Sequence, residues 1–219
     1  MAQTDHRTRI ILILLFGVAM AYVEAMVVVY LRELLYPEGF SFPLKLMPLN
    51  LIAMELSREL ASIAMLVAVA AIAGKKFWER FGYFIILFGI WDIFYYVWLK
   101  VTIDWPSSLF DWDILFLIPI PWIGPVIAPI LVALLMVITG LSITSLFARG
   151  YTFRPTAITW VLSGVGMTAL LFSFMWDTGA TLHQQMPQPY MYGLLVVGLL
   201  LNLTAYLVSY RKTITASAL

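Results

Sequence analysis

Five ionisable residues interrupt the long apolar stretches of the first half of the chain, and their side chains are the ones best suited to chemistry. They are Glu24, Glu55, Arg58, Glu59 and Asp92. A charged side chain that faces lipid at the centre of a membrane helix costs about 2.5 to 3.5 kcal/mol on the insertion scale. Because five such costs would oppose membrane insertion, we expect these side chains to face protein or water.

The spacing of these residues favours a single polar cluster. Glu55 and Glu59 are one helical turn apart, and Arg58 is three residues from Glu55, within side-chain reach. At 1.5 Å of rise per residue, the acids of the three predicted helices share a similar depth, at or slightly outside the membrane midplane. We predict a ligand- or cation-binding site that consists of Glu24, Glu55, Arg58, Glu59, Asp92 and Tyr96.

The charge of this predicted cluster is unbalanced, because it holds four carboxylates and one guanidinium. In a low-dielectric site the surplus carboxylates must take up protons, bind cations or meet another basic group. Oxygen ligands suit protons and hard divalent cations such as Mg²⁺, and they do not suit copper or catalytic zinc. If a metal binds, its predicted ligands are Glu24, Glu55, Glu59 and Asp92.

Three functions are compatible with such a cluster. The leading hypothesis is a small transporter or permeation protein that binds a cation or proton, coupled to a small solute. An intramembrane or lipid-modifying enzyme that uses buried carboxylates for acid–base chemistry is the second. The third is an accessory subunit of a larger membrane complex. A buried ion-pair network that only fixes the helix register is the purely structural alternative.

The composition identifies the kind of element that must position these side chains. Of the 219 residues, 63% are hydrophobic and only 11% are charged, whereas soluble domains are about 45 to 50% apolar and 25% charged. This predicts an all-α, polytopic protein of the lipid bilayer and argues against nucleic-acid binding. The chain has no cysteine and two histidines, which excludes thiolate centres and multi-histidine metal enzymes.

Six apolar segments are long enough to cross a hydrocarbon core, which needs roughly 20 residues of helix. We predict one integral membrane domain over residues 1–219, with spans at about 10–31, 46–73, 81–99, 123–147, 156–176 and 190–210. Nine basic residues fall on one side of these spans and three on the other. Because cytoplasmic loops collect Lys and Arg, both termini should be cytoplasmic, and we expect a bacterial inner membrane.

The connection between the third and fourth spans is rich in tryptophan, proline and aspartate. Ser107 or Ser108 could cap a helix that begins near Leu109, and Pro119 and Pro121 would end or kink it. We therefore predict an interfacial or re-entrant half-helix on the outer side. A secondary outer site for a cation or for substrate entry is predicted at Asp104, Asp111, Asp113, Asp177 and His183, with solvated loop charge as the alternative.

Small and polar residues form one stripe on each of the last two predicted spans. They are Thr159, Ser163, Gly166, Ser173 and Asp177 on the fifth, and Gly198, Asn202, Ala205 and Ser209 on the sixth. Such stripes let helices approach closely. We expect the two stripes to pack against each other, and a homo-oligomer or a membrane partner bound through one of them is the alternative.

Overall fold

A computed structural model describes residues 5–216 of the chain, which are mostly helical. Six long helices account for most of them: α1 (His6–Leu35), α2 (Leu49–Ala73), α3 (Phe77–Ile103), α4 (Ile127–Ala148), α5 (Ala157–Met175) and α7 (Tyr192–Thr215). The short α6 (Thr178–Leu182) follows α5. The prediction of six helices long and apolar enough to cross a membrane is confirmed, with α5 and α6 counted as one segment.

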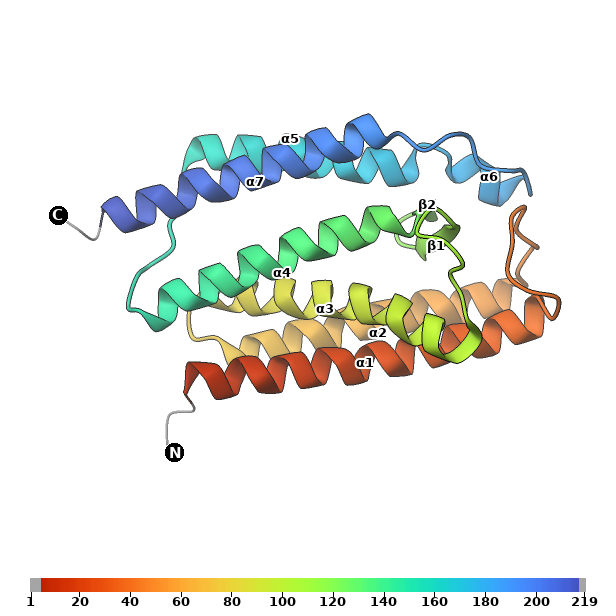
Figure 1. Cartoon of the computed structure of the whole chain (residues 1–219), viewed down its shortest axis with the longest axis horizontal. Helices are drawn as coiled ribbons and strands as arrows, with labels where there is room; N and C mark the ends of the chain where they lie inside the picture. The colour runs from red at the N-terminus through yellow and green to blue at the C-terminus, as the bar shows by residue number, and fades with distance from the viewer. Residues whose placement is uncertain (1–4, 217–219) are drawn as a thin grey trace.

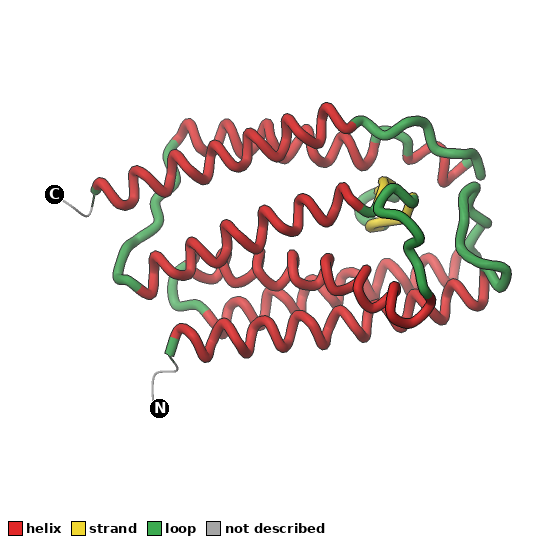
Figure 2. The backbone as a smooth tube through the Cα atoms, in the orientation of Figure 1, coloured by secondary structure: helices red, strands yellow, loops and turns green. Residues whose placement is uncertain are grey.

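The helices run roughly along one axis and form two groups. Helix α3 packs against α1, α2 and α4, whereas α5 packs mainly against α7. Figure 1 shows α5 and α7 side by side, with α4 between this pair and the first three helices. The start of α1 and the end of α7 lie at the same end of the molecule. The α1–α2 loop lies at the opposite end, and the hairpin between α3 and α4 lies toward it (Figure 2).

Glycines allow α3 and α4 to approach each other closely. A Cβ atom added to Gly140 would lie 2.6 Å from the Gly82 carbonyl oxygen, and one added to Gly89 would lie 2.6 Å from the Ala133 carbonyl oxygen. Real Cβ atoms do not come so near a backbone oxygen, so a larger residue would push the helices apart. This contact holds α3 in the middle of the first group, where it positions Asp92 and Tyr96.

The stripes of small residues on α5 and α7 face each other, as the sequence predicts. A Cβ atom on Gly166 would lie 2.5 Å from Asn202 Nδ2 and 3.0 Å from the Gly198 carbonyl oxygen. A Cβ atom on Gly198 would lie 2.6 Å from Leu170 Cγ. The stripe residues at this crossing therefore pack against each other within the chain.

Replacing Gly166 by alanine is expected to destabilise the α5–α7 pair by about 1 to 3 kcal/mol, the usual cost of overpacking a close contact. Gly164 lies on the same helix, and a Cβ atom there would meet nothing within 4 Å. The matched change Gly164→Ala should therefore leave stability unchanged or raise it slightly. Thermal unfolding of the two purified variants in one detergent checks this, and equal melting temperatures would contradict the close contact.

The segment between α3 and α4 contains a β-hairpin in place of the predicted half-helix. Strands β1 (Trp112–Phe116) and β2 (Trp122–Pro125) pair antiparallel, with Asp113 opposite Gly124 and a register shift between Ile114 and Phe116. The half-helix prediction was wrong because this stretch is rich in β-branched and aromatic residues and carries prolines that remove helical N–H donors. Ser107 and Ser108, the two predicted helix caps, lie in a turn instead: the Ser107 hydroxyl and the Ser108 N–H group both donate hydrogen bonds to Asp111 Oδ2.

Candidate functional site

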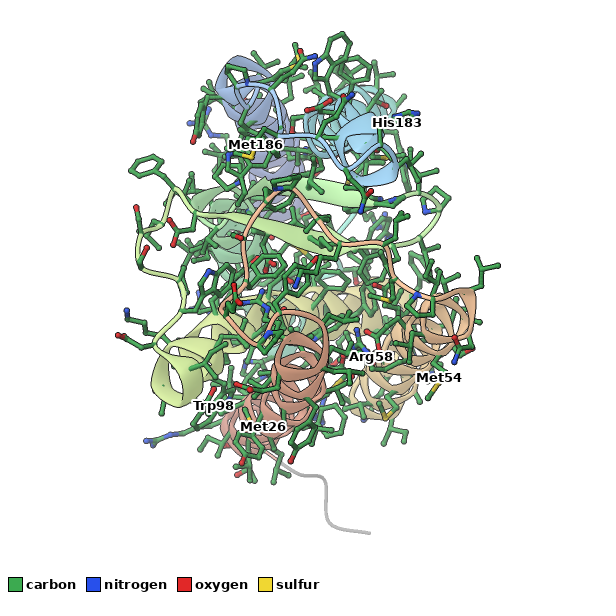
Figure 3. All side chains as sticks on the ribbon, turned by 90° about the vertical axis from the view of Figure 1, so that its right-hand side faces the viewer. Met26, Met54, Arg58, Trp98, His183 and Met186 are labelled. Carbon is green, nitrogen blue, oxygen red and sulfur yellow. The ribbon has the colours of Figure 1, made fainter. Side chains whose placement is uncertain are left out.

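Arg58 lies at the centre of a charged cluster between α1 and α2. Its Nη2 and Nε donate hydrogen bonds to Glu55 Oε2 over 2.8 and 3.0 Å, and its Nη1 contacts Glu24 Oε2. Both glutamates are buried and Arg58 is half-buried. Seen from the end that carries the α1–α2 loop, Arg58 lies between the ribbons of these two helices (Figure 3). One guanidinium is thus shared by two carboxylates, and we call Glu24, Glu55 and Arg58 the Arg58 triad.

Ser62 belongs to this site, although the sequence analysis did not identify it. Its Oγ lies 2.6 Å from Glu24 Oε1 and donates a hydrogen bond to it, and only 1% of the residue is exposed. Ser62 follows Arg58 by one helical turn, so both lie on the face of α2 that meets α1. That spacing is the signal that would have found it. Its hydroxyl completes the contacts of Glu24 within the α1–α2 interface.

Glu59 faces the hairpin and has no cationic partner in the part of the chain that the structure describes. Both of its carboxylate oxygens lie 3.0 Å from the backbone nitrogen of Leu117, which donates a hydrogen bond to them. Leu117 directly follows β1, at the tip of the hairpin. Glu59 is only 5% exposed, so this acid is buried with a single N–H group as its donor.

Asp92 lies near the middle of α3 and is half-buried. Among residues 5–216, no hydrogen bond or ion pair joins its carboxylate to another group. Lys100, two turns further along α3, pairs with Asp104 over 2.7 Å and so does not fold back toward Asp92. Of the predicted cluster, Glu24, Glu55 and Arg58 are therefore bonded to one another, whereas Glu59 and Asp92 are further carboxyl groups in the same group of helices.

A second buried ion pair fixes the base of the hairpin to the end of α1. Arg32 Nη2 lies 2.8 Å from Asp113 Oδ1, and both side chains are buried. The Arg32 guanidinium carbon is 4.1 Å from the ring centroid of Phe40 and 3.8 Å from that of Trp105. This geometry combines a charge-assisted hydrogen bond with two cation–π contacts. The two charged residues are 81 positions apart, and the sequence analysis did not pair them.

Tyr96 is buried and lies closer to this second pair than the sequence suggests. Its ring packs against Trp105, the residue that also flanks Arg32, with the ring centroids 6.2 Å apart. The neighbouring Tyr95 ring lies 5.0 Å from Tyr96. The two tyrosines therefore occupy the C-terminal half of α3, and no hydrogen bond within residues 5–216 joins Tyr96 to the Arg58 triad.

Two acids of the predicted outer site, Asp104 and Asp111, are bonded to residues three or four positions away. Lys100 donates to Asp104 and holds the pKa of this carboxyl below its usual value. Burial acts to raise the pKa of Asp111, but hydrogen bonds from Ser107 and Ser108 outweigh it, so that this pKa is also lowered.

Asp177 and His183 bond to groups other than the hairpin acids. Asp177 Oδ2 accepts a hydrogen bond from the Gln188 backbone N–H over 2.7 Å. His183 Nδ1 lies 2.9 Å from the Gly179 carbonyl oxygen, beside α6 and far from Arg58 in Figure 3. Across residues 5–216, no three acidic or histidine side chains are placed to hold one metal ion. The described residues therefore assemble neither the predicted four-carboxylate metal site nor the outer cation site.

The class of protein follows from these features: a helical chain with six segments able to cross a membrane and a buried arginine shared by two glutamates. Comparison with protein-family models, with curated proteins and with solved structures gave no match to this chain.

Proposed function

We propose that this chain is an integral membrane protein that binds and releases protons at its buried carboxylates and couples this to the passage of a small solute or cation. In this proposal both termini are cytoplasmic in a bacterial inner membrane, and the hairpin and the α1–α2 loop face the outer side. The basic residues at the end that holds both termini support this orientation.

The observation that carries the proposal is the uncompensated charge inside the helical bundle. Arg58 can neutralise only one of its two glutamates, and Glu59 and Asp92 have no cationic partner within residues 5–216. Three formal negative charges thus remain among buried and half-buried side chains. A static ion-pair network needs no surplus acids, and each one makes such a network more costly. Reversible neutralisation of these surplus carboxylates would give them a function.

The separation of the acids favours protons as the neutralising species. Within residues 5–216, Glu59 accepts from one backbone N–H group and the Asp92 carboxylate has no hydrogen-bond or ion-pair partner, whereas Glu24 and Glu55 share Arg58. Hard divalent cations require several oxygen ligands around one point, while a proton requires one carboxylate. Each surplus acid can therefore take up a single proton in its own surroundings.

The test is the pH dependence of stability and of proton flux for Glu59→Gln and Asp92→Asn. Protonation removes uncompensated charge from the folded protein, so the stability of the parent should rise as the pH falls. In each amide variant, the unfolding free energy should change less with pH than in the parent, by up to about 1.4 kcal/mol per pH unit, which is the linkage value for one proton. Thermal unfolding across pH and dye-reported proton flux in proteoliposomes provide the two measurements.

Glu33→Gln is the matched control, because Glu33 is an exposed acid near the end of α1. It should retain both the pH dependence and the flux of the parent. If Glu59→Gln and Asp92→Asn also behave like the parent in both measurements, the proposed function is wrong.

A further inference from the structure

The hairpin is attached to the helices at two points of different chemical character. At its base, Asp113 of β1 is paired with Arg32 of α1. At its tip, the Leu117 N–H group is bonded to Glu59 of α2. Leu117 is bonded to a residue ten positions into α2, roughly 15 Å along the helix from its first residue. The tip therefore reaches well below the helix ends and covers the Glu59 carboxylate.

The two attachments respond differently to a proton. The base joins opposite charges, and Asp113 Oδ1 also accepts the Ile114 N–H over 2.9 Å. The tip holds one N–H group between two oxygens of a carboxylate that has no cationic partner within the described chain. When Glu59 takes up a proton, one of those oxygens becomes a hydroxyl, and the Leu117 nitrogen offers no lone pair to accept it. The bond also loses its charge assistance, which roughly halves its strength.

We propose that the β1–β2 hairpin is a proton-controlled cover, held shut by the Glu59 carboxylate and released at its tip when Glu59 takes up a proton from the outer side. This inference rests on the proposed function, because it assigns the access of outer protons to one carboxylate of the same site. The base attachment through Arg32 keeps the hairpin on the bundle while the tip moves.

The charged groups around Glu59 are consistent with this role. On α2, Arg58 and Glu55 are the charged neighbours of Glu59. Arg58 is at the same time bonded to Glu24 of α1 and to Glu55. The hairpin contributes only the uncharged Leu117 N–H group. Within residues 5–216, no group that bonds to Glu59 thus carries a permanent charge, so one proton changes the attachment.

Spin labelling tests the cover directly, because the chain contains no cysteine and a single introduced cysteine will carry a single label. Ile120, which is 40% exposed in the loop between the strands, is changed to cysteine and labelled with a nitroxide. In lipid nanodiscs, the ratio of mobile to immobile label at Ile120→Cys should rise roughly tenfold as the pH falls from about 8 to about 5. Glu59→Gln should show the mobile spectrum at both pH values.

Three further variants make the result specific. Leu117→Pro removes the N–H donor and retains Glu59, so its label should be mobile at every pH. Glu33→Gln should respond like the parent. A label at Val101→Cys, at the exposed outer end of α3, should not respond to pH.

The cover is disproved if the label at Ile120→Cys does not respond to pH in the parent, or if Glu59→Gln keeps the response of the parent. Proton flux measured on the same preparations separates the two proposals. A Glu59-dependent label response without any flux would overturn the transport function and support the cover. Glu59-dependent flux with an unresponsive label would support the transport function and overturn the cover.

Discussion

Replacing Arg58 by glutamine is expected to lower the free energy of unfolding by about 3 to 5 kcal/mol, the usual cost of removing one partner from a buried ion pair. The loss is large because Arg58 is the counter-ion of both Glu24 and Glu55. Without it, two carboxylates remain at the α1–α2 interface with no counter-charge. Thermal or denaturant unfolding of the purified protein in detergent measures the effect.

The same variant should recover stability when the carboxylates are neutralised. Lowering the pH supplies protons to Glu24 and Glu55, so the deficit of Arg58→Gln should shrink in acid. The triple variant Glu24→Gln, Glu55→Gln, Arg58→Gln should be close to the parent at all pH values, because neutral replacement of a buried charged triad is often neutral or stabilising. Arg211→Gln, at an exposed position of α7, is the control. A triple variant as unstable as the single one would mean that Arg58 acts through packing alone.

Replacing Asp113 by asparagine should be the second most damaging change, at about 3 kcal/mol or more. It leaves Arg32 buried between Phe40 and Trp105 without a counter-ion, and it loosens the hairpin at its base. Unfolding measurements give the free energy, and amide hydrogen exchange of β1 and β2 reports whether the hairpin separates from α1.

Asp111→Asn is the matched control for this change. Asp111 lies two residues before Asp113, and within residues 5–216 its side chain bonds only in its own turn, to Ser107 and Ser108. Asp111→Asn should lower the free energy of unfolding by less than half as much as Asp113→Asn, and it should leave amide hydrogen exchange in β1 and β2 unchanged. Equal losses in the two variants would show that the Arg32–Asp113 pair has no special part in holding the hairpin.

The helices were predictable because the signal for each is contained in its own residues. A run of about 20 apolar residues has few alternatives in lipid, where every backbone group must be hydrogen-bonded internally. The bond between Arg58 and Glu55 was predictable for a similar reason, since the two residues are three positions apart on one helix. Pattern and local spacing decide such features before any tertiary contact forms.

The hairpin and its partners were not predictable in this way. The prolines and tryptophans of residues 100–129 fit a kinked half-helix as well as paired strands when they are considered alone. Strand pairing depends on the close fit of β2 against β1 and of the hairpin against the helices. In the structure, Arg32 and Glu59 bond to hairpin groups 81 and 58 positions away. Periodicity in the sequence does not predict contacts between residues so far apart.

Six long apolar helices with a surplus of acids among them follow from the residues alone, because hydrophobic length and charge are properties of residues. The distribution of those acids depends on the folded structure, in which Glu24 and Glu55 share Arg58 and Glu59 bonds to the hairpin. The reason is geometric. A side chain's partner is set by how helices rotate and pack against one another, and that packing depends on contacts between residues far apart in the chain.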